Sequence, residues 1–314
     1  MQNQEKIMYD LTIIGGGPAG VAAGVYASRK RLKTAFITDS FGGQSEVSTN
    51  IQNWIGTPSI SGNDLAKQLE EHLKSYAGDI LAVHKGERVK TVERIEPFHF
   101  KVTTEGGNEI ESKAVLVTTG SHRRKLDIPG AEKFDNKGVT YCASCDGPLF
   151  ADQDVVVVGG GNAGLETAMQ LLAYTTSVTL LHRRDEFKGD PVTVEKLQKN
   201  EKFTGITNAE PVEIKGEAMV EAVVYKDTNT GETHELKVGG VFVEIGLVPN
   251  TSFVENLVEL NEYKQVVIDP WTQQATEDGL WAAGDCTNVL YHQNNIAAGD
   301  GVRALEDIYK KLFA

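Results

Sequence analysis

The chain has 314 residues, of which 40% are hydrophobic and 24% are charged, and its formal net charge at pH 7 is −13. This length favours about two domains, and the composition is ordinary for a globular protein with sizeable cores. The strongly acidic charge argues against binding to nucleic acid or to an anionic membrane surface.

Three cysteines occur, Cys142, Cys145 and Cys286, which is too few for a secreted disulfide framework or for a site of four thiolates. The N-terminal residues show no apolar signal region, and no apolar run approaches the roughly 18 residues typical of a membrane span. We therefore expect a cytoplasmic protein without a metal site.

The first predicted elements form a βαβ unit. A short apolar strand leads into a glycine-rich loop, then a helix and a second strand, over residues 11–14, 15–20, 21–31 and 34–37. Helical periodicity follows over 65–76, and alternating patterns predict strands over 88–96, 98–103 and 109–117.

A pair of thiols comes next, in Cys142-Ala143-Ser144-Cys145-Asp146. Two cysteines separated by two residues can close a redox-active disulfide. The carboxyl group of Asp146 follows directly and could handle a proton. Because a nucleotide-binding motif begins within ten residues of Asp146, the pattern suggests electron transfer between a nucleotide and the thiols.

The βαβ pattern then recurs in the same order, over residues 155–158, 159–164, 165–173 and 178–181. The first glycine of each loop permits a tight turn, the second lets backbone approach a pyrophosphate, and the third lets helix and strand pack closely. These glycines are Gly15, Gly17 and Gly20 in the first loop and Gly159, Gly161 and Gly164 in the second. The loop residues also expected beside the phosphates are Pro18, Ala19, Asn162 and Ala163.

The ends of the two second strands predict different ligands. Asp39 can accept hydrogen bonds from the hydroxyls of an unphosphorylated ribose, as in FAD or NAD. The equivalent positions in the repeat are His182, Arg183 and Arg184, and arginines can hold a 2′-phosphate. Lys188 adds charge nearby, so the second site is expected to prefer NADP.

Further strands are predicted over 220–226, 235–237 and 241–245, another strand runs into Asp285, and a final helix spans about 297–312. The region after about Pro249 has no counterpart in the repeat and most simply returns to the first domain. The sequence thus predicts an α/β fold of two Rossmann-like, three-layer ββα domains, the second inserted in the first. The first comprises 1–121 and 250–314, the second 122–249, and their two connections could act as a hinge.

In order and spacing these motifs resemble those of the low-molecular-weight bacterial thioredoxin reductases, along essentially the whole chain. The matching segments are 15–20, 42–44, 53–54, 119–120, 142–147, 159–164, 182–184, 284–285 and residue 293. The resemblance implies a homodimer in which an FAD domain is interrupted by an NADPH domain that carries the dithiol. It adds to the FAD site Gly42, Gly43, Gln44, Asn53, Thr119, Gly120, Asp285 and Gln293.

The resemblance also implies a route for electrons. NADPH would reduce the flavin, the flavin would reduce the Cys142–Cys145 disulfide through Cys145, and Cys142 would attack the disulfide of thioredoxin or a related redoxin. Asp146 would protonate a thiolate in this exchange.

Some segments depart from that family. Lys188 stands where it commonly has Arg, which leaves NADH possible, and His292-Gln293-Asn294 stands where it commonly has Arg-Gln-Ala. Residues 142–150 and 285–287 are closer to the alkyl hydroperoxide reductase flavoproteins, which carry a further thioredoxin-like segment. A peroxiredoxin or a glutaredoxin-like redoxin is therefore an alternative acceptor. More distant alternatives are a ferredoxin–NADP reductase-like diaphorase and a non-enzymatic flavin redox sensor.

Overall fold

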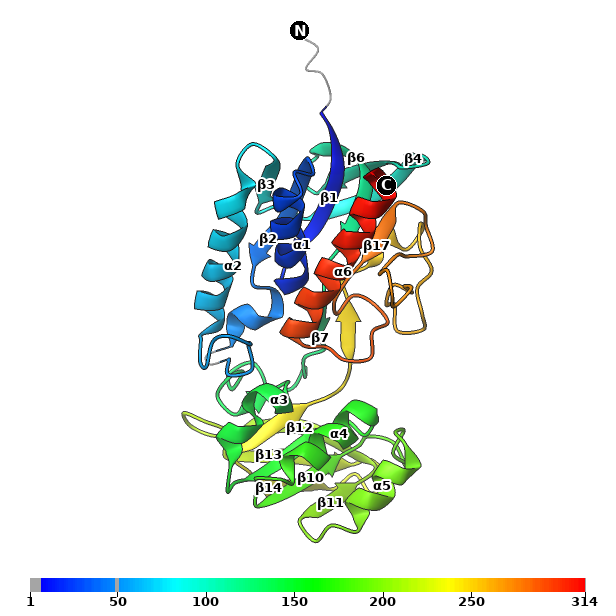
Figure 1. Ribbon diagram of the computed structural model, residues 1–314. Helices are drawn as coiled ribbons and strands as arrows, with labels where there is room; N and C mark the ends of the chain where they lie inside the picture. The colour runs from blue at the N-terminus through cyan, green and yellow to red at the C-terminus, as the bar shows by residue number, and fades with distance from the viewer. Residues whose placement is uncertain (1–6, 49–50, 314) are drawn as a thin grey trace. The chain divides into compact units, whose positions relative to one another are not determined.

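The computed structural model describes residues 7–48 and 51–313. The chain forms two compact units, which we call unit 1 (residues up to 122, with 248–314) and unit 2 (123–247). In Figure 1 the blue N-terminal and red C-terminal segments belong to unit 1, and the green segment forms most of unit 2. The domain boundaries expected from sequence, at 121/122 and 249/250, lie one and two residues from these divisions.

Unit 1 is built on a sheet in the order β3-β2-β1-β6-β5-β4. Strand β17 pairs with the C-terminal end of β6, and β5 pairs with its N-terminal end. Its strands are β1 (Met8–Gly16), β2 (Thr34–Phe41), β3 (Leu81–Lys85), β4 (Val89–Glu96), β5 (His99–Thr104), β6 (Glu109–Val117) and β17 (Leu280–Ala282). Its helices are α1 (Pro18–Arg29), α2 (Gly62–Ala77) and α6 (Asn294–Phe313), with short 3-10 turns at η1 (Gly43–Val47) and η3 (Ser252–Val254).

Alternate residues of β6 pack into two different cores. Leu116 belongs to a cluster with residues of α1, α2 and α6, whereas Val115 and Val117 belong to a cluster with residues of the 254–275 segment. Because side chains alternate along a strand, the central sheet is buried on both faces. This burial explains why β1 and β6 have nearly continuous apolar runs.

Unit 2 contains a parallel sheet in the order β11-β10-β9-β15-β8 and an antiparallel sheet in the order β12-β13-β14. Its strands are β8 (Val139–Thr140), β9 (Asp154–Val158), β10 (Ser177–Leu181), β11 (Phe203–Ile206), β12 (Ala209–Lys215), β13 (Ala222–Asp227), β14 (Thr233–Lys237) and β15 (Gly240–Val243). Its helices are α3 (Ala143–Asp146), α4 (Asn162–Leu171) and α5 (Pro191–Gln198), and η2 (Gly147–Phe150) follows α3.

The strand registers of the two units are equivalent. In unit 1 Leu11 pairs with Thr34, and in unit 2 Val155 pairs with Val178, each residue 144 positions after its counterpart. The predicted fold class, with two parallel-sheet Rossmann-like domains, is confirmed. The elements that were not predicted include β3, β11, β12 and α5, all short or weakly patterned.

The chain passes between the units twice, and the two crossings pair as strands β7 (Ser121–Arg123) and β16 (Leu247–Pro249). A glycine precedes each crossing, Gly120 with φ of +61° and Gly246 with φ of +106°. Both conformations are strained for residues with a side chain. No helix of the described segments has the length and apolar character needed to cross a membrane.

Candidate active site

A cavity of about 810 Å³ opens in unit 1 at the carboxyl ends of the parallel strands. Ligands of open α/β sheets bind at this edge, and the volume suits a cofactor. The predicted flavin-site residues that line it are Gly15, Gly17, Pro18, Ala19, Asp39, Gly42, Gly43, Gln44, Thr119, Gly120 and Asp285. Three other predicted residues lie outside this lining, namely Gly20, Asn53 and Gln293.

The glycines of the first loop differ in what requires them. Gly15 has φ of +119°, in the left-handed region, and a Cβ on Gly20 would overlap the carbonyl oxygen of Gly15. Gly17 has an ordinary φ of −76°, and a Cβ there would meet no protein atom within 4 Å. Nothing within the unit therefore requires glycine at position 17, and the open space beside it suits the close approach of a ligand.

Helix α1 begins directly at this space. Pro18 occupies the first helical turn, and no described side chain caps the N-terminus. The free N–H groups of the first turn and the positive end of the helix dipole are therefore available to an anion. The cavity, the open position at Gly17 and the uncapped helix together fit the pyrophosphate of a dinucleotide cofactor.

Asp39 lies at the rim of the same cavity, at the end of β2. Its Oδ2 accepts hydrogen bonds from Nε and Nη2 of Arg88, at 2.9 and 2.6 Å. Arg88 also lines the cavity. Arg88 was not predicted, because it comes 49 residues after Asp39 and no motif links the two.

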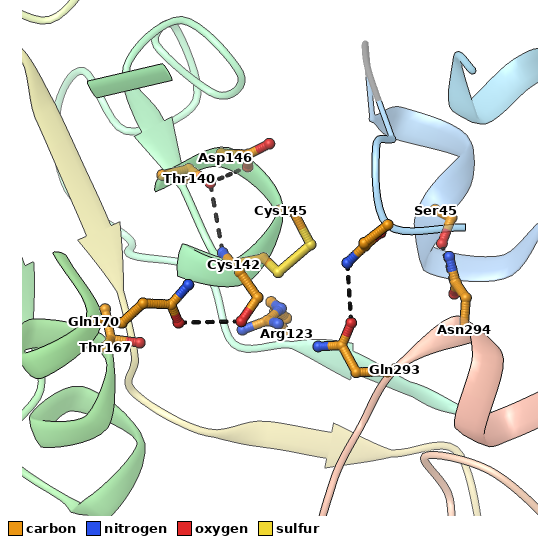
Figure 2. The surroundings of a disulfide bond; sticks show 12 residues. Ser45, Arg123, Thr140, Cys142, Cys145, Asp146, Thr167, Gln170, Gln293 and Asn294 are labelled. Atoms are coloured by element: carbon orange, nitrogen blue, oxygen red, sulfur yellow. Dashed lines mark hydrogen bonds between the residues drawn. A yellow bond between two sulfur atoms is a disulfide. The ribbon is translucent and has the colours of Figure 1, made fainter. Parts of the chain in front are cut away.

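Polar side chains connect the loop after β2 to the C-terminal part of unit 1. Gln44 Nε2 donates to Ser121 Oγ at 3.3 Å and to Asp285 Oδ2 at 3.5 Å. Asn53 Nδ2 donates to Gln293 Oε1 at 3.1 Å, a hydrogen bond drawn beside the label of Gln293 in Figure 2. The predicted residues Asn53 and Gln293 are thus brought together with each other.

The second glycine loop repeats the geometry of the first. Gly159 has φ of +123°, and a Cβ on Gly164 would overlap the carbonyl oxygen of Gly159. A Cβ on Gly161 would meet nothing within 4 Å, and no described side chain caps α4. The loop therefore offers the same kind of anion site.

Two neighbouring residues complete this loop. Asn162 Oδ1 accepts a hydrogen bond from the backbone N–H of Asp190 at 2.7 Å, so its side chain joins the loop to the start of α5. Ala163, in the first turn of α4, is exposed. Asn162 thus has a structural role that the motif alone did not predict.

The residues that follow β10 behave differently from one another. Arg183 and Arg184 are exposed, and within residues 7–48 and 51–313 neither forms an ion pair. Lys188 Nζ instead pairs with Glu186 at 2.7 Å. The two arginines are therefore the cations that remain available to an incoming phosphate.

His182 is buried, and its Nδ1 accepts a hydrogen bond from the N–H of Gly160 at 3.1 Å. Burial lowers the pKa of His182, and the charge of Arg184 acts in the same direction. The neutral ring holds the glycine loop in place. The structure thus places His182 against the loop that is predicted to bind the nucleotide, and its contact with the nucleotide itself stays a prediction.

The two thiols of unit 2 form a disulfide, Cys142–Cys145, around the short helix α3. Figure 2 shows the bond with Thr140 and Asp146 beside it. The hydroxyl of Thr140 donates to Asp146 Oδ2, and the N–H of Cys142 donates to Thr140 Oγ1 over 3.5 Å. Ser144, between the cysteines, donates to Gln170 Oε1 of α4 at 3.1 Å, which anchors α3 to that helix.

Asp146 is half-buried, and burial raises its pKa, while the Thr140 hydrogen bond and the charge of Arg123 oppose this rise. Arg123 Nη1 lies 3.5 Å from Glu244 Oε2, and Glu244 Oε1 accepts from Thr167 Oγ1 at 3.0 Å. Burial also raises the pKa of Glu244. A carboxyl group that keeps its proton toward neutral pH can protonate a thiolate.

Sequence reasoning missed Thr140, Arg123 and Glu244 because none of them belongs to a spaced motif. The only available signal was a hydroxyl residue two positions before Cys142, which is common in any sequence. Cys286 is fully buried and its thiol donates to two backbone carbonyls, and burial raises its pKa to about 12. This thiol is therefore unreactive, in agreement with a packing role.

His292, one of the residues that depart from the family pattern, has a buried Nε2 without a hydrogen-bond partner among the described residues. Within the same residues, no group of three or more His, Cys, Asp or Glu side chains could hold a metal ion.

Comparisons with known proteins place these features in context. A family model described as pyridine nucleotide-disulphide oxidoreductase matches residues 9–301. A protein named NADH dehydrogenase from Bacillus subtilis (strain 168) is 39% identical over 300 residues, which cover 96% of this chain and 58% of that protein. The F subunit of alkyl hydroperoxide reductase from Staphylococcus aureus (strain NCTC 8325 / PS 47) is 40% identical over 301 residues, with 96% and 58% covered.

Solved structures match over nearly their whole length. Thioredoxin reductase from Streptococcus pyogenes MGAS5005 is 34% identical, with 97% of this chain and 98% of that chain covered and a TM-score of 0.89. Thioredoxin reductase from Giardia duodenalis is 31% identical, with 98% and 100% covered and a TM-score of 0.92. By contrast, the chain spans only 58% of the two curated relatives described above.

Proposed function

This chain belongs to the pyridine nucleotide-disulphide oxidoreductase family, and we propose that it passes electrons from NADPH through FAD and the Cys142–Cys145 disulfide to a thioredoxin disulfide. Family membership implies a flavin and a pyridine nucleotide. The observation that carries the proposal is the disulfide of unit 2, whose second cysteine lies 14 residues before Gly159 of the second glycine loop. A pure diaphorase would have no use for it.

In this proposal unit 1 holds FAD. Gly17 and the first turn of α1 would bind the pyrophosphate, Asp39 the adenosine ribose, and Asp285 the ribityl chain. Gln44 would position Asp285 through their hydrogen bond. Bound FAD would supply a two-electron carrier between the nicotinamide and the disulfide.

Unit 2 would hold NADPH, with Gly161 and the first turn of α4 at the pyrophosphate. Arg183 and Arg184 would bind the 2′-phosphate, since both are exposed and without an ion pair among the described residues. Lys188 contributes less, because Glu186 pairs with it. NADPH is therefore preferred, and NADH is used more weakly.

The thiols would divide the work of disulfide exchange. Cys145 receives electrons, Cys142 attacks the disulfide of the partner, and Asp146 protonates the thiolate that is released. Exchange of this kind proceeds through a mixed disulfide and is faster when the leaving thiolate can be protonated. We also propose a homodimer in which unit 2 turns about β7 and β16 between its two reactions, with Gly120 and Gly246 as pivots.

Steady-state oxidation of NADPH and NADH by the FAD-loaded protein tests this proposal, with thioredoxins, glutaredoxin-like redoxins and peroxiredoxins as acceptors. We expect thioredoxin to support turnover. Cys145→Ser should abolish reduction of the acceptor while the flavin still accepts electrons from NADPH. Acceptor reduction that survives this substitution would point to a diaphorase, and no turnover with any acceptor would point to a sensor.

A peroxiredoxin is the second candidate acceptor. It is favoured by 40% identity to proteins named as the F subunit of alkyl hydroperoxide reductase, compared with 34% to a thioredoxin reductase. Turnover with a peroxiredoxin alone, and none with any thioredoxin, would select this candidate.

A further inference from the structure

Thr140 lies at the end of β8, two residues before the first cysteine, and is 5% exposed. Its hydroxyl contacts two parts of the dithiol segment. It donates to Asp146 Oδ2 and accepts from the N–H of Cys142. Within the part of the chain that the structure describes, no other side chain hydrogen-bonds to the Asp146 carboxyl group.

These two hydrogen bonds indicate where the proton of the Thr140 hydroxyl group points. A threonine hydroxyl has one proton to donate and lone pairs that accept. Because the N–H of Cys142 occupies an acceptor position, the proton of Thr140 is free to point toward Asp146. One carboxyl oxygen, Oδ2, is therefore held by Thr140, and the other, Oδ1, is left to carry a proton.

We propose that Thr140 is a positioning residue for the disulfide chemistry, which holds Asp146 through Oδ2 so that Oδ1 gives its proton to the thiolate released from the Cys142–Cys145 disulfide. The inference deepens the proposed function and rests on it for the role of Asp146. Two electrons from a reductant, a thiol or a reduced flavin, break the S–S bond. A proton from Asp146 converts one released thiolate to a thiol, and the carboxylate recovers its proton from solvent.

Because Asp146 titrates, the rate of this proton transfer should depend on pH. The charged and titratable groups around it are Arg123, whose charge reaches both Asp146 and Glu244, and the two thiols once they are reduced. The Thr140 hydrogen bond stabilises the carboxylate, so its loss should move the titration of Asp146 to higher pH. We expect Thr140→Val to shift it upward by about one pH unit.

The test uses the full-length protein and dithiothreitol, without flavin, nucleotide or protein acceptor. The rate at which dithiothreitol reduces the Cys142–Cys145 disulfide is measured against pH by alkylation of the released thiols and mass spectrometry. At each pH the reduction rate of a protein is divided by the reduction rate of Asp146→Asn, so that the effect of the titration of dithiothreitol cancels. The ratio for the unsubstituted protein should fall as Asp146 loses its proton.

Thr140→Val should move this fall to higher pH, and Thr140→Ser, which keeps the hydroxyl, should restore the original profile. Thr175→Val is the matched control, since Thr175 is equally buried in unit 2 but its hydroxyl donates to the backbone of Leu171. If Thr140→Val does not fold, Thr140→Ala replaces it. A profile for the Thr140 variant that coincides with the unsubstituted protein overturns the proposal, and so does an Asp146→Asn profile without any loss of rate. Failure of thioredoxin turnover in the separate NADPH assay would instead count against the proposed acceptor alone.

Discussion

The two glycine loops have the same backbone but different surroundings at the end of the next strand. Gly15 and Gly159 have φ angles of +119° and +123°, and their strands pair in equivalent registers. Near the end of β2, however, Asp39 is paired with Arg88, whereas after β10 two arginines are exposed without an ion-pair partner among the described residues. The loop geometry suits any pyrophosphate, so the difference between the ligands must come from the strand ends.

The largest expected effect comes from filling the open space beside each loop. Gly17→Val should weaken FAD binding by about a hundredfold or more, because the side chain would displace the pyrophosphate from the N–H groups of α1. Gly161→Val should do the same to NADPH and leave FAD bound. Equilibrium dialysis of FAD and the KM for NADPH measure the two effects.

Both glycines have ordinary backbone angles, and a Cβ added to either would have no protein atom near it, so both variants should fold. Circular dichroism provides that control. Loss of FAD from Gly161→Val would contradict the assignment of the two ligands to the two loops.

The next effect tests the strand end of unit 2. Replacing both Arg183 and Arg184 by Ala should raise the KM for NADPH by about ten- to a hundredfold, because each charged hydrogen bond to the 2′-phosphate is worth about 1.5 kcal/mol or more. The KM for NADH, which lacks that phosphate, should change little. An equal loss with both nucleotides would mean that the arginines do not contact the 2′-phosphate.

A smaller effect is expected at the strand end of unit 1. Asp39→Asn should weaken FAD binding by only a few-fold, because the amide oxygen still accepts a hydrogen bond and the ion pair with Arg88 is exposed to solvent. Fluorescence titration with FAD measures this change. The internal control is the ratio of the KM for NADPH to the KM for NADH. This ratio should stay constant, because Asp39 lies in unit 1 and the nucleotide is assigned to unit 2.

The sequence predicted the backbone of the candidate site better than its polar contacts. The glycine spacing identified Gly15 and Gly159, because a turn with positive φ leaves a mark at one position in the chain. The repeat also predicted that one domain is inserted in the other. These features depend on local chemistry or on a regular offset, and both can be recognised in a single sequence.

The partners of the polar side chains could not be predicted. Arg88 reaches Asp39 from the loop before β4, 49 residues further along the chain, and Glu244, which directly follows β15, meets Arg123 at the end of β7. The hydrogen bond from the Gly160 N–H to the buried ring of His182 was likewise not predicted. Such contacts depend on how strands far apart in the chain are brought together, which spacing does not encode.

The smallest predicted effect concerns the stability of the dithiol segment, which unit 2 contains and unit 1 lacks. Burial raises the pKa of Asp146 above its value in the unfolded chain. Such a group stabilises the fold when protonated, and this contribution is lost as the pH rises through the unfolded and then the folded pKa. Asparagine does not titrate, so Asp146→Asn should gain stability relative to the unsubstituted protein as the pH rises above the pKa of an unfolded aspartate, about 4, by a few degrees at most.

The effect should be confined to unit 2, and the chain allows this to be measured. All three tryptophans, Trp54, Trp271 and Trp281, lie in unit 1, so the thermal change in tryptophan fluorescence follows that unit. Hydrogen exchange of peptides that cover α3 and β9 follows unit 2. We expect exchange at α3 to slow in Asp146→Asn at the higher pH while the fluorescence transition stays where it was. A shift of the same size in both measurements would mean that the two units unfold together, and a shift of the opposite sign at α3 would mean that Asp146 is stabilised there as a carboxylate.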